Sequence, residues 1–427
     1  MNKFWFFVYN FILLPVFWIT FRILSLFNPK IREGFSGRKE IFSSMENFKK
    51  SSPGLPVIII HSSSLGEYQQ AIPVVRQLLS KKIFSLVFTF FSPSGYKNSK
   101  VNFQNSIKSY LPFDTIGNAK KLFDILNPEL IILMRYDLWF NFLYEAKKRN
   151  IKTVITNARF DENDKIWKIP LLKSFKITLF KMINTLFVID DEDERNYKQK
   201  LHNSYTEIIK VGDSKFERVF EVAKNEEAAR LLDSKITEGK KIFVMGSSWK
   251  DDEEIILPVL NNIIKYDNTL LTILVPHEPK ETKLLMIEKN ISENFDNLKS
   301  IRYSEIEKYS GENIIIVDSI GKLMSFYSIA YMSYVGGGFR TGLHNILEPV
   351  IFNMPVFFAN EVKNSDEDEV LLNAGCGFLV NDKKSFYRNF REILINKDLR
   401  DEIGKKCSLV FDNKLGTAKK IIDYLYN

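Results

Sequence analysis

The hydrophobic pattern opens with one long apolar segment and then alternates short apolar runs with amphipathic stretches. From Phe4 to Phe27 the sequence holds one charged residue, Arg22, and one proline, Pro15. A helix of about 20 apolar residues crosses a bilayer, so the segment is long enough to do so. Its length and its lack of a small-residue cleavage site distinguish it from a secretory signal peptide. We therefore expect a membrane anchor over residues 1–30.

Charges on either side of this segment predict its orientation. Lys3 precedes it, whereas Lys30, Arg32, Arg38 and Lys39 follow it. Because basic residues are retained on the cytoplasmic side, the body of the protein is expected in the cytoplasm. The aromatic residues of the segment are equally compatible with a helix that lies in the membrane interface. A buried core helix is the third interpretation, and the sequence leaves the depth of the anchor open.

After the anchor, two series of β-rich runs alternate with helical patterns, which is typical of parallel βαβ units. The runs of the first series are 56–60, 84–90, 130–134, 153–156 and 185–189, and those of the second are 242–245, 270–276, 314–317, 332–335 and 356–358. A Lys- and Glu-rich helical stretch over 216–240 separates them, and residues 416–427 are expected to form a last helix. The sequence thus predicts an α/β fold of two Rossmann-like, doubly wound lobes facing a cleft, over residues 31–220 and 221–427. Neither lobe opens with GxGxxG, so a dinucleotide cofactor is not indicated.

Composition narrows the function classes only slightly. The net charge of +8 indicates a polyanionic partner, either nucleic acid or an anionic lipid surface. Two cysteines do not form a disulfide framework and suit a reducing compartment. Four histidines occur without an HExxH or paired CxxC motif, so no metal site is expected.

The string His61-Ser-Ser-Ser-Leu-Gly-Glu67 follows the first β run and opens a helix. A carboxylate at Glu67 can take a proton from an attacking hydroxyl. Ser64 and Glu67 also have the spacing of a capping box, which closes the first turn of a helix. The two interpretations are compatible, and both are kept.

Further glycine-rich and polar strings follow β runs of the second lobe. The longest, Gly336-Gly-Gly-Phe-Arg-Thr-Gly-Leu-His-Asn-Ile-Leu-Glu-Pro349, lets the backbone approach a ligand and places a glutamate where it can accept ribose hydroxyls. In Val317-Asp-Ser-Ile-Gly-Lys-Leu323, Asp318 or Ser319 can cap the next helix and leave amides for a phosphate. A plain turn or cap is the alternative explanation for each string.

Together these strings resemble the 3-deoxy-D-manno-octulosonic acid (Kdo) transferase family, which are membrane-anchored glycosyltransferases of the GT-B fold. The resemblance extends nearly from end to end. It rests on HSSSLGE, PFD at 112–114, DLWFN at 137–141, NARF at 157–160, GDSKF at 212–216, GSSW at 246–249, PHE at 276–278, VDSIGKL and GGGFRTGLHNILEP. The order and spacing resemble most the Bacteroidetes-type members.

The resemblance implies a reaction and a role for each matching residue. Kdo would move from CMP-Kdo to a lipid A precursor (lipid IVA), with inversion, at the cytoplasmic face of the inner membrane. Glu67 would be the general base, Lys215 would stabilise charge in the transition state, and Ser64, Gly66 and Asp137 would lie on the acceptor side. The donor would be bound by His277, Glu278, Ile320, Gly321, Lys322, Gly337, Gly338, Asn345, Ile346, Leu347 and Glu348. The implied partners are CMP-Kdo, the lipid acceptor and anionic membrane lipids rather than nucleic acid, and no cofactor or metal is implied.

Two positions depart from the family pattern. Arg135 stands where many members have the first glutamate of ExELW, and a cation cannot replace a carboxylate, although Asp137 can supply part of that role. His277 stands where PRH would place its arginine, which weakens a phosphate clamp there. Two alternatives therefore remain open: a GT-B enzyme that uses a UDP-sugar for another envelope glycolipid, and a membrane-tethered homologue without activity.

Overall fold

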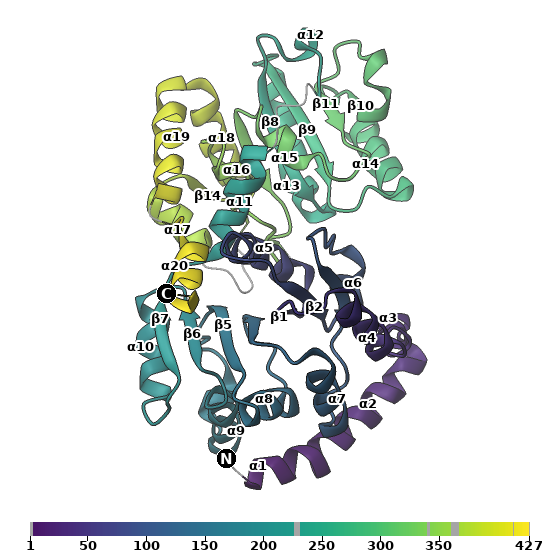
Figure 1. The fold of residues 1–427 in the computed structure, drawn as a ribbon. Helices are drawn as coiled ribbons and strands as arrows, with labels where there is room; N and C mark the ends of the chain where they lie inside the picture. Colours follow the sequence, from purple (N-terminus) through teal and green to yellow (C-terminus); the bar gives the residue numbers. More distant parts are fainter. Residues whose placement is uncertain (1–2, 226–230, 340–341, 360–366, 413, 427) are drawn as a thin grey trace. The chain divides into compact units, whose positions relative to one another are not determined.

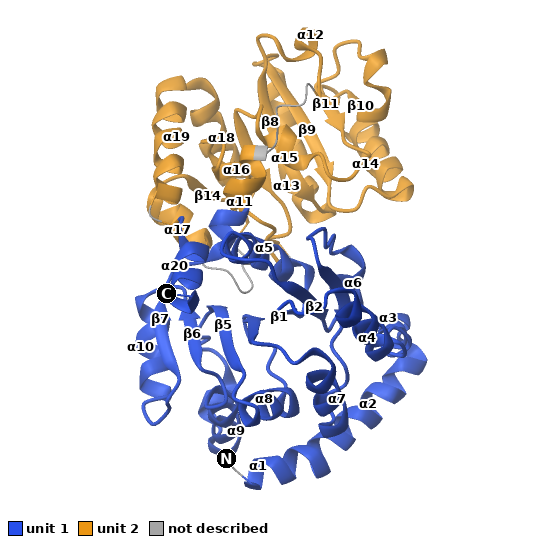
Figure 2. Cartoon of the chain, viewed as in Figure 1, with its two compact units in different colours: residues 1–218, 415–427 blue, residues 219–414 orange. Residues whose placement is uncertain are grey.

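The computed structural model describes residues 3–225, 231–339, 342–359, 367–412 and 414–426. The chain divides into two compact units, unit 1 over residues 1–218 and 415–427 and unit 2 over residues 219–414 (Figure 2). Each unit is described by itself below.

Unit 1 is built on seven parallel strands in the order β3-β2-β1-β4-β5-β6-β7 (Figure 1). The strands are β1 (Val57–Ser62), β2 (Ser85–Phe90), β3 (Ser106–Tyr110), β4 (Leu130–Met134), β5 (Lys152–Ala158), β6 (Thr185–Val188) and β7 (Glu207–Lys210). The central strands are buried throughout, as expected of continuous Val, Ile and Leu runs with helices on both faces. The strand order reverses between β1 and β4, so the loops after these two strands lie at the switch point where such sheets bind ligands.

Helices cover both faces of this sheet and divide its core in two. Side chains alternate along β1, so that Ile59 packs in one apolar cluster and Ile58 and Ile60 pack in the other. The helices after the N-terminal one are α3 (Pro29–Ser36), α4 (Ile41–Ser51), α5 (Leu65–Leu79), α6 (Pro93–Asn98), α7 (Ile116–Leu126), α8 (Phe140–Lys148), the 3₁₀ helix η2 (Lys165–Lys168), α9 (Pro170–Phe180), α10 (Asp191–Lys200) and α20 (Thr417–Tyr426). Helix α11 (Ser214–Asn225) begins in unit 1 and continues into unit 2.

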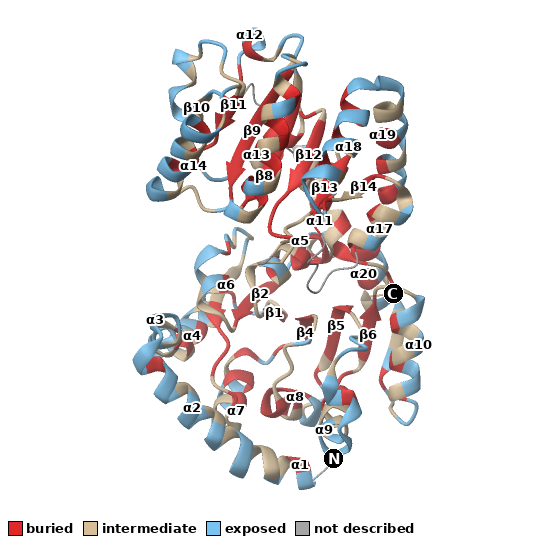
Figure 3. Ribbon diagram, turned by 180° about the vertical axis from the view of Figure 1, so that it is seen from behind, coloured by how far each residue is buried: buried red, intermediate tan, exposed pale blue. Residues whose placement is uncertain are grey.

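The N-terminal apolar segment is one continuous helix whose two faces differ. It consists of α1 (Lys3–Val8), a π turn η1 (Tyr9–Leu13) and α2 (Leu14–Phe27). One face packs on unit 1, where Trp5 is buried and Asn10 exchanges two side-chain hydrogen bonds with Asn141. The other face is exposed and apolar (Figure 3). Within the part of the chain that the structure describes, Lys3–Phe27 is the one helix long and apolar enough to cross a membrane, and only 6% of its most apolar window is buried.

The C-terminal helix corrects the sequence-based domain boundary. We expected residues 221–427 to form the second lobe, but α20 packs against α5 in unit 1. Its apolar face, with Ile421 and Ile422, completes the core beside β1, and Tyr424 contacts Phe187 of β6. This return of the chain depends on distant partners, which the local pattern of the helix does not reveal.

Unit 2 is a second parallel sheet of seven strands, in the order β10-β11-β9-β8-β12-β13-β14. The strands are β8 (Lys241–Ser248), β9 (Leu270–Pro276), β10 (Ser300–Arg302), β11 (Ile314–Ile316), β12 (Met332–Val335), β13 (Val356–Phe358) and β14 (Gly377–Leu379). The helical elements are α12 (Ser234–Thr237), α13 (Lys250–Ile264), α14 (Glu281–Asn294), the 3₁₀ helix η3 (Tyr303–Lys308), α15 (Leu323–Tyr327), α16 (Leu347–Val350), α17 (Glu367–Ala374), α18 (Lys383–Ile395) and α19 (Lys397–Asp412). The strand order reverses between β8 and β12, so the loops after them form the corresponding switch point.

The prediction of two doubly wound α/β lobes is confirmed, and each of the ten expected runs is a strand. Strands β3, β7, β10 and β14 were missed because they lie at or next to sheet edges and are short, polar or interrupted. The helix expected over 216–240 is wrong in its length. Helix α11 ends at Asn225, residues 226–230 lie outside the described residues, and α12 is a separate short helix.

Candidate functional site

The loop between β1 and α5 holds Glu67 at the start of a long helix. Ser64 is the N-cap residue of α5, and its hydroxyl accepts the backbone N–H of Glu67 at 3.3 Å. The Glu67 carboxylate accepts the backbone N–H of Ser63 at 2.6 Å and also the Ser63 hydroxyl. The capping-box prediction is thus met in part, because the carboxylate reaches the residue before the N-cap. Gly66 is exposed in the first turn.

The environment of Glu67 suits a carboxylate that exchanges protons. The side chain is partly exposed, and burial raises its pKa against the opposing effect of the Ser63 hydrogen bonds. A carboxylate with a raised pKa binds a proton more strongly while it stays within reach of solvent and ligand. Helix capping and a role as base are therefore compatible in this geometry.

A buried histidine links this loop to the loop after β4. His61 Nε2 lies 2.8 Å from Asp137 Oδ2, and His61 Nδ1 lies 2.9 Å from the Thr89 hydroxyl. The His61 side chain is buried, whereas the Asp137 side chain is about one-fifth exposed. The pair joins β1, β2 and β4 at the switch point and fixes Asp137 beside Glu67. The sequence analysis quoted His61 within a motif but did not assign it to the site.

Arg135 is held in a hydrogen-bonded network on the same side of the sheet. Its backbone adopts the left-handed conformation with φ of 60°, and its Nε donates to Gln70 Oε1 at 3.2 Å. Asn157 donates to the same Gln70 oxygen and to Asp213. The guanidinium therefore bonds an amide of α5 and does not reproduce a carboxylate, in line with the expectation from its charge.

The same network positions the start of α11, where Lys215 lies. The Ser214 hydroxyl donates to the Gln70 carbonyl at 2.7 Å, and the Lys215 backbone N–H donates to Asp213 at 2.7 Å. Since Gln70 is three residues after Glu67 in α5, the backbone of Lys215 lies close to the helix that carries Glu67. The structure thus ties the start of α11, which carries Lys215, to the helix that carries Glu67.

Two other motifs of the sequence have structural roles. Asp114 of PFD is buried and accepts the backbone N–H groups of Asn141 and Phe142, so it caps α8 from a distant loop. It also accepts the hydroxyl of Tyr9, and burial raises its pKa to about 7. Asp114 and Asn141 therefore tie the N-terminal helix to the loop that presents Asp137.

In unit 2, three ring side chains stack where β8, β9 and β12 end. Trp249 stacks on His277 with ring centroids 4.6 Å apart, and His277 stacks on His344 at 4.3 Å. Trp249 Nε1 donates to His344 Nε2 at 3.3 Å, which requires a neutral His344. Burial lowers the pKa of His344 to about 4, so the ring is neutral at physiological pH. Trp249 and His344 were quoted in motifs but not assigned to the site, because stacking across three strands leaves no local pattern.

The glycine loop after β12 is held by a buried carboxylate. Asp252 accepts the Tyr334 hydroxyl at 2.6 Å, the Trp249 N–H at 2.8 Å and the Gly337 N–H at 3.1 Å. A side chain at Gly336 or Gly338 would collide with backbone atoms, so both positions require glycine. The Gly337 amide therefore has a protein partner, and its predicted contact with the donor would need a rearrangement of this loop.

The residues after the glycine loop separate into surface and core positions. Asn345 Nδ2 donates to Glu348 Oε1 at 3.1 Å, and both side chains are half-buried. Ile346 and Leu347 are at most 1% exposed. Their side chains belong to the core, so a role in donor binding is restricted to their backbone groups.

The remaining residues that were predicted to bind the sugar donor lie in loops after β9 and β11. Glu278 pairs with Lys280 at 2.9 Å and with Lys283 at 3.6 Å, and Lys283 also lies over the Trp249 ring. Ile320 is exposed, and Lys322 lies 4.1 Å from the centre of the Tyr303 ring.

The expected side-chain cap before α15 is wrong. Helix α15 begins at Leu323 without such a cap, because Asp318 instead binds Ser304.

Comparison with known proteins shows which family the chain resembles. The family model described as 3-deoxy-D-manno-octulosonic-acid transferase (kdotransferase) matches residues 36–218, which is most of unit 1 and includes Glu67, Asp137 and Lys215. The chain is similar to this Kdo transferase family over that segment. Over its whole length it is similar to the 3-deoxy-D-manno-octulosonic acid transferase of Haemophilus influenzae, with 28% identity over 99% of this chain and 98% of that protein.

Further relatives agree with this assignment. The 3-deoxy-D-manno-octulosonic acid transferase of Chlamydophila psittaci is 28% identical over 77% of this chain and 76% of its own length. Among solved structures, the UDP-GlcNAc 2-epimerase of Neisseria meningitidis bound to UDP-GlcNAc matches with a TM-score of 0.58 at 11% identity, covering 87% of this chain and 99% of that one. That likeness shows the fold alone. It confirms the prediction of two Rossmann-like lobes of the GT-B type.

Proposed function

We propose that this protein is a Kdo transferase that moves Kdo from CMP-Kdo to a lipid A precursor, with Glu67 as the general base. The observation that carries the proposal is the geometry of Glu67. Its carboxylate is partly exposed at the switch point of unit 1, is held by Ser63 and has a raised pKa, within the segment that the family model matches. The named relatives supply the reaction class, and the carboxylate supplies the chemistry.

The reaction is a single displacement at the anomeric carbon of Kdo. Glu67 takes the proton from an acceptor hydroxyl while that oxygen bonds to the anomeric carbon, and the bond to the CMP phosphate oxygen breaks on the opposite face. The configuration inverts, and no second carboxylate is needed as a nucleophile. The ammonium of Lys215, which begins α11 beside α5, stabilises the negative charge that moves onto the phosphate.

Unit 2 offers groups for each part of the donor. The carboxylate of Glu348, held by Asn345, accepts ribose hydroxyls. Lys280 and Lys283 lie around Glu278, next to His277, the position at which the family's usual arginine is replaced. They supply positive charge for the phosphate in its place. Since CMP leaves as a monophosphate, the proposal requires no metal ion.

The N-terminal helix supports a site at the cytoplasmic face of the inner membrane. Its exposed face is apolar, but its other face is hydrogen-bonded to the body through Trp5, Tyr9 and Asn10. A helix that left the body to span the bilayer would lose these bonds. We therefore place it in the interface, with the body held against anionic lipids by the basic residues that follow.

Donor competition and product stereochemistry test the proposal. CMP should inhibit Kdo transfer by the detergent-solubilised protein, whereas UDP at the same concentration should not. The product should carry Kdo with the anomeric configuration opposite to that of the donor, as read by carbon NMR. Inhibition by UDP alone would point to a UDP-sugar transferase, retention would remove the single-base mechanism, and binding of neither nucleotide would indicate a protein without this activity.

A further inference from the structure

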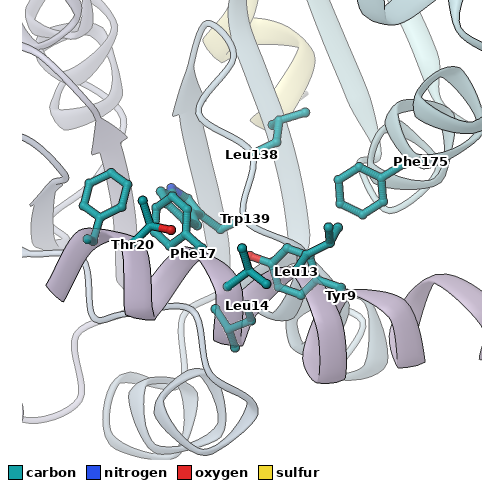
Figure 4. A pocket seen from close by; sticks show the side chains of 10 residues that line it. Tyr9, Leu13, Leu14, Phe17, Thr20, Leu138, Trp139 and Phe175 are labelled. Carbon is teal, nitrogen blue, oxygen red and sulfur yellow. The ribbon is translucent and has the colours of Figure 1, made fainter. Parts of the chain in front are cut away.

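An apolar groove lies between the N-terminal helix and the body of unit 1. Its volume is about 460 Å³, within the range of about 300–1,000 Å³ that is typical of ligand pockets. Figure 4 shows side chains from the helix on one side, Leu138 and Trp139 from the loop after β4, and Phe175 from α9. The lining residues are Tyr9, Leu13, Leu14, Val16, Phe17, Thr20, Phe21, Leu138, Trp139 and Phe175.

The few polar atoms of this groove leave it suited to a hydrocarbon chain. The Tyr9 hydroxyl donates to Asp114, so its polar group already has a partner. Trp139 Nε1 is buried and has no hydrogen-bond partner among the described residues. A buried donor without an acceptor is costly, and a carbonyl oxygen of a ligand would satisfy it. An acyl chain that begins with an ester or amide carbonyl has both properties.

A continuous chain of contacts joins the groove to Glu67. Trp139 packs against Phe91 at 4.7 Å between ring centroids. The next residue, Ser92, donates its backbone N–H to the Ser63 carbonyl, and Ser63 in turn binds the Glu67 carboxylate. On its other side the groove loop begins at Asp137, the partner of His61. These contacts connect the loop that lines the groove to the loop that holds the candidate base.

We propose that this groove binds an acyl chain of the lipid acceptor and thereby places the acceptor hydroxyl at Glu67. The proposal rests on the proposed function, since it names the part of the acceptor that the same site recognises. Val16, which lines the groove, is exposed, as is Ile23 further along the helix, and they give the chain an apolar path from the bilayer to the groove. Binding energy from the remote chain then orients the reacting sugar.

A variant that fills the groove tests the proposal against a matched control on the same helix. Leu14 lines the groove, whereas Ile19 is exposed and does not. We expect Leu14→Trp to lower kcat/KM for the tetraacylated precursor about tenfold and to leave kcat/KM for a fully deacylated acceptor unchanged. Ile19→Trp should leave both values unchanged, because its side chain points away from the groove.

A second variant, in the loop after β4, tests the groove without a change in the N-terminal helix. Leu138→Ala enlarges the groove, and we expect it to shift the preference among acceptors towards longer acyl chains. Equal effects of Leu14→Trp on acylated and deacylated acceptors would overturn the proposal while leaving Kdo transfer intact. If Leu14→Trp shows such equal effects and also no longer binds anionic vesicles, the groove binds a bilayer lipid instead. If the wild type transfers Kdo to neither acceptor, the proposed function itself fails.

Discussion

Helix α5 of unit 1 and helix α13 of unit 2 are built alike but do different work. Each is 15 residues long, follows the first strand of its sheet and carries a proline in its interior. Each also has an acidic residue three positions after its N-cap, Glu67 in α5 and Asp252 in α13. In both, this carboxylate accepts a backbone N–H from the loop that precedes the helix.

The difference lies in what surrounds each carboxylate. Asp252 is 1% exposed and binds three donors from Tyr334, Trp249 and Gly337. Glu67 is partly exposed, and its carboxylate accepts hydrogen bonds from one neighbour, Ser63. The same local pattern therefore places a carboxylate that holds a loop in one unit and a candidate base in the other. Tertiary surroundings, and not the helix start, decide which role the carboxylate takes.

The largest expected effect is on turnover. Glu67→Gln removes the base but keeps an oxygen for the Ser63 N–H, so the fold should be retained. We expect kcat to fall by about 10²–10⁴-fold, the range of general base catalysis. Steady-state transfer assays measure this change, and Glu254→Gln, an exposed change in α13, is the control. A kcat within a few-fold of the wild type would mean that Glu67, like Asp252, is structural.

The next effect is on the stability of unit 2. Asp252→Ala removes an acceptor shared by three donors, and we expect it to lower the free energy of unfolding by about 3 kcal/mol. Denaturant titration measures the loss. Glu254→Ala in the same helix removes only an exposed pair with Lys250 and should cost less than about 0.5 kcal/mol. Similar losses of stability in the two variants would contradict the structural role assigned to Asp252.

Glu253, next to Asp252, should make the free energy of unfolding depend on pH because its carboxyl group is buried. Burial raises its pKa to about 7, against the hydrogen bond from Ser248. Because the folded pKa lies above the unfolded one, the stability contribution is full below about pH 4.5 and is lost as the pH rises through 7. Relative to Glu253→Gln, the wild type should lose about 3 kcal/mol of unfolding free energy between pH 4.5 and pH 8. A difference that does not change with pH would contradict the raised pKa.

The smallest expected effect is on the pKa of Glu67, and it tests the role of this residue as the base. The Ser63 hydroxyl donates to the Glu67 carboxylate and favours its ionised form. Ser63→Ala removes that bond while the backbone N–H remains, so the pKa of Glu67 should rise further. The acidic limb of the kcat/KM profile, which reports ionisation of the base, should move to higher pH. An unchanged limb would mean that another group controls it.

Sequence reasoning found strands and motifs well and spatial partners poorly. Continuous apolar runs such as Leu130–Met134 marked the central strands, since parallel strands are covered on both faces. The glycines around Gly337 and the acidic residue at Glu67 carried local signals.

What the sequence could not reveal depended on contacts between distant segments. The His61–Asp137 pair joins residues 76 positions apart, and Asn10 pairs with Asn141 across 131 positions. The stack of Trp249, His277 and His344 likewise exists only after three strands align. The return of α20 to unit 1 has the same cause, because an amphipathic pattern indicates that a face is buried but not which surface covers it.

The most direct test of the account is the mass of the acceptor after incubation with CMP-Kdo, with wild type and Glu67→Gln run side by side. The account predicts that the wild type raises the mass of the tetraacylated precursor by one or more Kdo units, and that Glu67→Gln binds CMP equally well yet forms almost no product. Equal product from both proteins would contradict the assignment of the base. No product from a folded wild type that binds CMP would contradict the acceptor.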